Sequence, residues 1–262
     1  MNTTLPALGR LFFFLILADI PPPILTAQAP ESIIILDPGH GGKDRGGLGP
    51  NGFSKSNIKV PEDPYNYDVA LRILKLSEKT NWLVAFTVID DDNKSPNNND
   101  LLPARNGIHY NLTFNRAINT RDRISLTNRV YFSNIFNAFF PSTPIVFISI
   151  HFDHAPNYVC GARIFTWRDM GTHPFVLILN ETLKADGIHF KILGKTAQGI
   201  NYWNNLFVLH HGIVSPRILI ELGNYNCQED RLRMQSADGR EAYAKAITKA
   251  LEIYLASIKK AP

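Results

Sequence analysis

The stretch IIILDPGHGG, residues 33–42, decides how the fold is interpreted. Four consecutive apolar residues, most of them β-branched, predict a strand that is covered on both faces. The proline and glycines that follow end the strand abruptly and deliver His40 at its carboxyl end. Binding sites in open α/β sheets lie outside the carboxyl ends of strands. A lone His there is more often a hydrogen-bonded loop residue, so a functional role needs further residues beside it.

Strands and helices alternate along the rest of the chain. The periodicity of the apolar residues, and the Gly, Pro and polar residues that interrupt it, predict the strands and helices. Strands are expected at residues 32–36, 82–89, 144–150, 161–166 and 217–222, and helices at residues 65–79, 121–139, 173–185 and 237–257. This order predicts a single α/β domain with a largely parallel, twisted sheet and helices on both faces.

Length and composition agree with one globular domain. The chain has 262 residues, of which 45% are hydrophobic and 19% charged, and this is enough for a substantial core. The formal net charge is +4, but Lys and Arg are scattered without a basic stripe, which argues against nucleic acid as a partner. We expect a monomer.

The N-terminus has the order of a secretory signal peptide. Arg10 precedes the apolar block LFFFLILADI, and the small-residue stretch AQA follows. The block is too short to span a bilayer comfortably. Asp19 and Pro30 depart from the pattern, so a retained anchor is the alternative for residues 1–30. We expect an exported protein, in a periplasm or outside the cell, with no membrane span after cleavage.

Cys160 and Cys227 are the only two cysteines of the sequence. In an exported protein an isolated pair is a disulfide candidate, whereas two Cys alone are too few for a structural zinc site. Their pairing is therefore a hypothesis.

Three strand-end residues suggest a metal site. If the strands run parallel, His40, His151 and Glu221 meet at one edge of the sheet. A catalytic zinc site takes three protein ligands, for example two His and a carboxylate, and leaves a position for water. The two His supply the nitrogens. Glu62, Asp63 or Glu221 could supply the carboxylate, and a second carboxylate is needed as general base.

Five motifs then occur in an order that resembles a known family. They are LDPGHGGKDRGG, EDPYNYDVAL, TRDRISLTNRV, SIHFDHAPNYVCGARIF and ILIELGNYNCQED. Together they cover most of residues 31–258 and resemble the zinc-dependent N-acetylmuramoyl-L-alanine amidases that carry DPGHGG near the start and SIH in the middle. The resemblance implies a peptidoglycan hydrolase, with a catalytic domain over residues 31–262, that cuts the amide bond between N-acetylmuramic acid and the L-alanine of the stem peptide. It also leaves room for a protein activator.

The resemblance also implies roles for individual residues. His40, Glu62 and His151 would bind one Zn²⁺ per chain, and Glu221 would be the catalytic carboxylate. Asp63 is the rival of Glu62, although the spacing to the Asn of EDPYN favours Glu62.

The chain departs from the family pattern in two places. Residues 51–61 and residues 90–119 look like inserted loops, and the second could form a rim over the cleft. Residues 167–205 contain no extra helix of the kind that plugs the site in some relatives, so we expect an open site. No cell-wall-binding repeat is visible.

Weaker candidates surround this group. Arg163 and Arg217 could contact stem-peptide carboxylates, because a guanidinium binds a carboxylate through two hydrogen bonds. His154 falls where the chain has left the strand, which suits a loop or substrate contact better than metal binding. His210 and His211 are expected on a loop near the site edge.

Other charged residues have simpler interpretations. Asp37 and Asp44 flank the first His, and we expect them to cap turns or to orient its imidazole. Arg121 and Arg129 lie on a predicted helix as surface or ion-pair residues.

Two alternative functions stay open. The first is a non-catalytic cell-wall-binding module on the same fold, which would be expected to lack a metal ligand or the catalytic carboxylate. The second is a zinc hydrolase, such as a carboxypeptidase-like enzyme, that acts on another acyl-amino compound.

Overall fold

The structure is a computed structural model. It describes residues 30–41, 44–47, 60–89, 95–99, 101–102, 108–109, 123–155, 159–188, 191–192, 199–202 and 205–259. Apart from Pro30, the predicted signal peptide lies outside these residues, as do most of the predicted insertion at residues 51–61 and Arg121.

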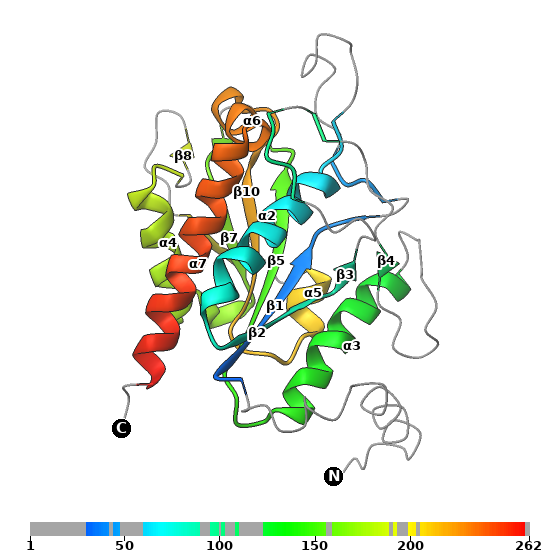
Figure 1. The fold of residues 1–262 in the computed structure, drawn as a ribbon. Coiled ribbons are helices and arrows are strands. Elements are labelled where there is room, and N and C mark those ends of the chain that lie inside the picture. The colour runs from blue at the N-terminus through cyan, green and yellow to red at the C-terminus, as the bar shows by residue number, and fades with distance from the viewer. Residues whose placement is uncertain are drawn as a thin grey trace. The chain divides into compact units, whose positions relative to one another are not determined.

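A six-stranded sheet forms the centre of the domain, in the order β2-β1-β5-β10-β7-β9 (Figure 1). The strands are β1 (Ser32–Pro38), β2 (Trp82–Phe86), β5 (Ile145–Asp153), β7 (Arg163–Thr166), β9 (Ile200–Tyr202) and β10 (Arg217–Asn224). The strands β2, β1, β5 and β10 run parallel to one another, whereas β7 pairs with β10 in antiparallel fashion and β9 runs parallel to β7. The predicted single α/β domain with a largely parallel sheet is confirmed.

Helices cover both faces of this sheet. The larger apolar core lies between one face and the helices α2 (Asp63–Leu76), α4 (Pro174–Ala185) and α7 (Ala237–Lys259). The smaller core lies on the other face, against α3 (Arg123–Phe139) and α5 (Phe207–His211). No helix in the described part of the chain combines the length and apolar character that a membrane crossing requires.

Short elements complete the described chain. They are η2 (Ser77–Lys79), β3 (Val88–Ile89), β4 (Ile108–His109), β6 (Val159–Cys160), η3 (Arg168–Thr172), β8 (Lys191–Ile192) and α6 (Gln228–Gln235). The strand predicted at residues 82–89 is split at Thr87, whose hydroxyl donates to the carboxylate of Asp37. Within the described part of residues 167–205, α4 is the only α-helix, and the expectation of an open site stays a prediction.

Part of residues 90–119, which the sequence predicts to be an inserted loop, belongs to the core. Leu102 is buried in the larger core, and its backbone N–H donates to Tyr65 Oη over 3.1 Å. The strand β4 also falls in this segment and pairs with β3. Composition alone predicted a loop because polar residues dominate the stretch, but one apolar side chain suffices to anchor it.

The sheet face that α3 covers changes from apolar to polar along the strands. Its apolar side chains come first and are Ile33, Ile35, Ile145, Phe147 and Leu219. The alternate positions that follow on the same strands carry Asp37, Ser149, His151 and Glu221. Since alternate residues of a strand share a face, the polar groups gather on this face toward the carboxyl ends.

Cys160 and Cys227 form a disulfide, with their Cα atoms 5.5 Å apart, which confirms the hypothesis of pairing. The bridge links β6 to the start of α6. These segments follow β5 and β10, and the disulfide therefore ties together the chain just beyond the two strands that carry His151 and Glu221.

Candidate metal centre and active site

His40 lies where the chain turns sharply after β1. Its φ of 65° is in the left-handed region, which non-glycine residues rarely occupy. The turn is closed by reciprocal backbone hydrogen bonds between Gly41 and Asp44, of 2.7 and 3.1 Å. The Asp44 Oδ2 atom lies 3.0 Å from His40 Nδ1. Asp44 therefore orients the imidazole, as predicted, and leaves Nε2 to face Glu62.

Glu62 directly precedes α2, and its carboxylate is fixed by three donors. Oε1 accepts hydrogen bonds of 2.9 Å from the backbone N–H of Phe152 and from Asn66 Nδ2, and Oε2 accepts one of 2.8 Å from the N–H of Gly47. The residue is 3% exposed. Burial raises the pKa of Glu62, but the neighbouring imidazoles outweigh it and hold that pKa well below its usual range.

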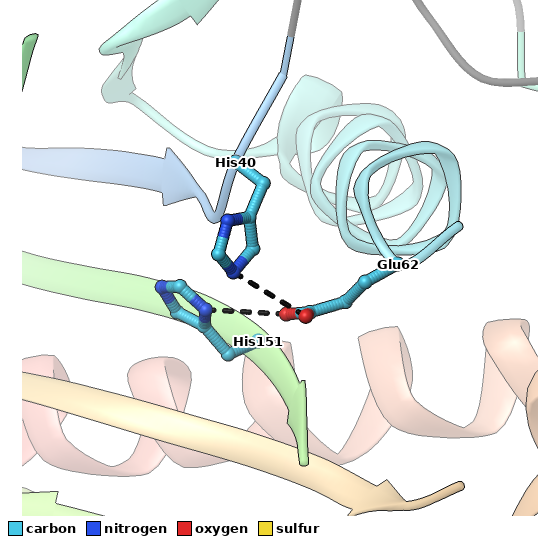
Figure 2. A group of neighbouring side chains, drawn as sticks. All are labelled: His40, Glu62 and His151. Atoms are coloured by element: carbon cyan, nitrogen blue, oxygen red, sulfur yellow. Dashed lines mark hydrogen bonds and ion pairs between the residues drawn. The ribbon is translucent and has the colours of Figure 1, made fainter. Parts of the chain in front are cut away.

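The structure brings His40, Glu62 and His151 together, and Figure 2 shows the carboxylate between the two imidazoles. His40 Nε2 lies 3.3 Å from Glu62 Oε2, and His151 Nδ1 lies 3.2 Å from Glu62 Oε1. The rings meet edge to face, with centroids 5.0 Å apart. Asp63, the rival of Glu62, begins α2 and does not belong to the group.

The group has the dimensions of a metal site. A tetrahedral ion about 2.0–2.1 Å from N and O ligands needs ligand atoms that are about 3.3 Å apart. The distances of 3.3 Å from His40 Nε2 to Glu62 Oε2 and of 3.2 Å from His151 Nδ1 to Glu62 Oε1 match this value, each at a different carboxylate oxygen. One ligand atom from each of the three residues lies within 4.8 Å of the other two. Two His and one carboxylate also form a ligand set that suits a catalytic ion. These residues therefore fit a metal.

Two glycines leave the space that these side chains occupy. A Cβ atom on Gly39 would lie 2.4 Å from the His151 ring, and one on Gly46 would lie 2.5 Å from both Glu62 Oε2 and the His40 ring. Gly46 also has a φ of 69°, which a side chain would strain. Gly39 and Gly46 therefore allow close approach of the ligand residues.

The charge of the group favours a cation. Burial lowers the pKa of His40, but Glu62 and Asp44 together raise it to about 10. The imidazole therefore holds a proton firmly in the metal-free site. A metal ion takes the place of such a proton, because a ligating imidazole must be neutral.

Glu221 lies beside this group on β10. Its Cα pairs in register with that of His151 on β5, and it is partly exposed, whereas its Oε2 is buried and accepts no hydrogen bond among the described residues. Burial and the charge of Glu62 raise the pKa of Glu221 to about 8, although Arg163 and His40 oppose the rise. A carboxylate with a pKa near neutrality is suited to proton transfer.

Two of the weaker candidates lie on segments next to this carboxylate. Arg163 pairs in register with Glu221 across β7 and β10, and its guanidinium forms an ion pair with Asp153. His154 is exposed just after β5, with its ring 6.5 Å from that of Tyr225. Sequence reasoning did not consider Asp153, which ends β5 on the same face as His151.

Arg217 is not brought to the group. It begins β10, four residues before Glu221, so the two are about 13 Å apart along the strand. Its guanidinium donates to the carbonyls of Leu209 and Val214 over 2.6 and 3.1 Å. His210 and His211 belong to α5, which packs beside the start of this strand. Their predicted loop position was therefore wrong.

Asp37 and Arg129 form a buried ion pair. The sequence predicted a surface or ion-pair role for Arg129 but did not identify Asp37 as its partner. Arg129 Nη1 lies 2.6 Å from Asp37 Oδ1, and both residues are almost fully buried. Asp37 does not orient the His40 imidazole, since its oxygens accept from Arg129, Ser149 and Thr87. The ion-pair prediction for Arg129 is confirmed, but the surface position is wrong.

An α/β domain with a His-Glu-His group and a further carboxylate at the carboxyl edge of its parallel strands has the arrangement that metal-dependent hydrolases use. The sequence narrows this class, because residues 34–253 match the family model Amidase_3, N-acetylmuramoyl-L-alanine amidase. The chain belongs to this family. It is an enzyme and a peptidoglycan hydrolase, and the interpretation as a non-catalytic wall-binding module is set aside.

Solved structures share the fold. The N-acetylmuramyl-L-alanine amidase Ami1 from Mycobacterium smegmatis matches with a TM-score of 0.59 and 21% identity, over 88% of this chain and 100% of that one. The catalytic domain of CwlV from Bacillus (Paenibacillus) polymyxa var. colistinus matches with a TM-score of 0.59 and 20% identity, over 86% and 98%. The CwlD amidase from Clostridioides difficile, seen in complex with the GerS lipoprotein, gives 0.58 and 21%, over 86% and 99%. No curated protein matches the sequence significantly.

Proposed function

We propose that the protein is a zinc-dependent amidase that hydrolyses the bond between the lactyl carbonyl of N-acetylmuramic acid and the L-alanine of the stem peptide. His40, Glu62 and His151 hold one Zn²⁺ per chain. The observation that carries the proposal is the Glu62 carboxylate between two imidazole nitrogens, at 3.2 and 3.3 Å. Nitrogen and oxygen ligands in this number suit Zn²⁺ and leave room for water and substrate.

Glu221 is the proposed general base and acid. Zinc, when bound, supplies a Lewis acid that polarises the scissile carbonyl and activates water. The Glu221 carboxylate accepts the proton of the attacking water as the C–O bond forms. It then passes that proton to the nitrogen of L-alanine as the C–N bond breaks. A buried Oε2 with no hydrogen-bond partner among the described residues is available for both transfers.

Arg163 and His154 are the proposed substrate contacts. Arg163 lies next to Glu221 on the neighbouring strand, and His154 is exposed beyond the end of β5. A guanidinium at this position suits the carboxylates and carbonyls of a stem peptide. Arg217 is left out of this proposal, because its guanidinium is used by backbone carbonyls at the far end of β10.

Digestion of purified peptidoglycan tests the function. The chain without residues 1–30 is incubated with Zn²⁺, beside the Glu221→Gln variant, and the products are read by mass. We expect intact stem peptides from the wild type and at least about 100-fold slower release from the variant, at equal zinc content. Shortened peptides in place of intact ones would support the alternative hydrolase that acts on another acyl-amino bond.

Export, oligomeric state and regulation are further proposals. A secretory signal over residues 1–30 is supported by its sequence pattern, and mass analysis of the mature N-terminus tests it. A monomer is tested by light scattering. Since CwlD is seen with the GerS lipoprotein, we propose by analogy a protein activator that raises the basal activity of the purified chain. No gain in stem-peptide release when an extract of the source cells is added to the purified chain would contradict it.

A further inference from the structure

We propose that Arg129 is a positioning residue of the metal centre: its guanidinium holds His40 in the backbone conformation that presents the imidazole to the metal. This inference rests on the proposed function, because it takes His40 as a ligand. It adds a residue that lies on a different element, α3, and that does not belong to the His40, Glu62 and His151 group.

The guanidinium is bonded to the end of β1 at three points. Arg129 Nη1 donates to Asp37 Oδ1 over 2.6 Å and to the carbonyl of Pro38 over 2.7 Å. Its Nη2 donates to the carbonyl of His40 over 2.8 Å. The side chain is 4% exposed. One side chain from α3 therefore clamps the four residues that end with the ligand.

The clamped turn is one that needs external support. A non-glycine residue with a positive φ is strained, and such a conformation persists only where the surroundings determine it. The φ of His40 is 65°. Asp44 contacts the imidazole, and Arg129 bonds the backbone carbonyl of the same residue. Without the second contact, the backbone is free to relax to a negative φ, and the imidazole would leave its place beside Glu62.

Asp37, which Arg129 contacts, is also bonded to β5, the strand that carries His151. Asp37 is 1% exposed, and its Oδ2 accepts a hydrogen bond of 2.6 Å from Ser149 Oγ. Ser149 pairs in register with Asp37 across β1 and β5, and it lies two residues before His151 on the same face. The network from Arg129 through Asp37 therefore holds the two ligand-bearing strands relative to each other.

The substitution Arg129→Lys separates the hydrogen-bond geometry of the Arg129 side chain from its charge. Arg presents a rigid planar fork of donors, whereas Lys carries the same charge on one ammonium group. Arg72 is a matched control, since it is also buried, bonds to Asp68 over 2.8 Å and to the carbonyl of Pro96 over 2.7 Å, and makes no bond to the metal group.

The experiment compares Arg129→Lys with Arg72→Lys in the chain lacking residues 1–30. Zn²⁺ affinity is measured by competition with a chromophoric chelator, and the melting temperature is measured on the metal-free proteins. We expect both variants to melt earlier, but only Arg129→Lys to bind Zn²⁺ about 10- to 100-fold more weakly, which is the usual effect of losing a partner behind a metal ligand.

Zinc affinity within twofold of wild type in Arg129→Lys would overturn the inference and leave the proposed function standing. Equal weakening in both variants would also overturn it, because the effect would then follow stability alone. Absence of zinc binding by the wild type would contradict the proposed function and the inference with it. If Arg129→Lys does not fold, Asp37→Asn against Asp68→Asn replaces the pair and is judged by the same criteria.

Discussion

Glu221 and His151 lie in register on neighbouring parallel strands, β10 and β5. In-register partners of a parallel pair place their side chains on the same face, with the strands about 4.8 Å apart. The proposed general base is therefore set beside the proposed metal ligand by the sheet itself. Rigid strands hold such pairs more closely than loops do.

Removal of the metal should lower the stability of the folded protein. An ion that binds only the folded state stabilises it by about 2.7 kcal/mol at 100 times its dissociation constant. We expect a chelator to lower the melting temperature and added Zn²⁺ to restore it. His151→Ala should lose most of this shift. His173→Ala is the control, because His173 caps α4 by accepting from the N–H of Phe175. A full zinc-dependent shift in His151→Ala would contradict the ligand assignment.

Gly46→Ala should impair metal binding, whereas Gly187→Ala should not. Both glycines have a positive φ, of 69° and 68°, so each substitution costs somewhat more than about 1 kcal/mol through backbone strain. At Gly46 the new Cβ would meet Glu62 and His40, at 2.5 Å, whereas at Gly187 none of the described residues lies within 4 Å of it. Calorimetric titration with Zn²⁺ distinguishes the two, and equal affinities would show that the turn tolerates a side chain.

Asp37→Asn should destabilise the protein in a pH-dependent way. Burial alone raises the pKa of Asp37, but Arg129 and the hydrogen bonds of Ser149 and Thr87 outweigh it, so the folded pKa lies below the ordinary value of 3.8. A depressed pKa stabilises the fold above 3.8, and the contribution is lost as the pH falls through the folded value.

Near pH 7 we expect Asp37→Asn to lower the free energy of unfolding by about 3–5 kcal/mol, as for a broken buried ion pair. The difference from wild type should shrink below about pH 4. Urea unfolding from pH 7 to pH 2.5 measures it, with the exposed Glu252→Gln as control. A constant difference over this range would rule out the carboxylate as its source.

Loss of the disulfide should destabilise the protein without removing the metal group. Cys160 and Cys227 are 67 residues apart in sequence, and closing a loop of this size contributes about 2–4 kcal/mol. The double Cys→Ser variant should therefore melt earlier than wild type. Reductant should lower the melting temperature of wild type only. If it lowers both equally, the bridge is not the source of the effect.

Strand ends were the part of the site that the sequence could predict. Apolar runs before His40 and His151 mark strands that are buried on both faces, and parallel strands bring their carboxyl ends to one edge. The structure confirms these strands and their parallel pairing. The positions of Arg217 and of His210 were not predicted correctly. A residue at the start of a strand or in a short helix leaves no periodic signal that shows whether it lies at the amino or the carboxyl edge of the sheet.

By itself, the sequence determined the α/β fold and which residues stand at the carboxyl ends of the strands, because local periodicity records burial. Only the tertiary structure decided that Glu62, and not Asp63, joins the two imidazoles, and that Arg129 supports the turn of His40. These relations join segments up to 89 residues apart. They depend on how α2 and α3 pack on the sheet. The sequence alone could not predict them, because this packing is set by the whole core and not by any local pattern.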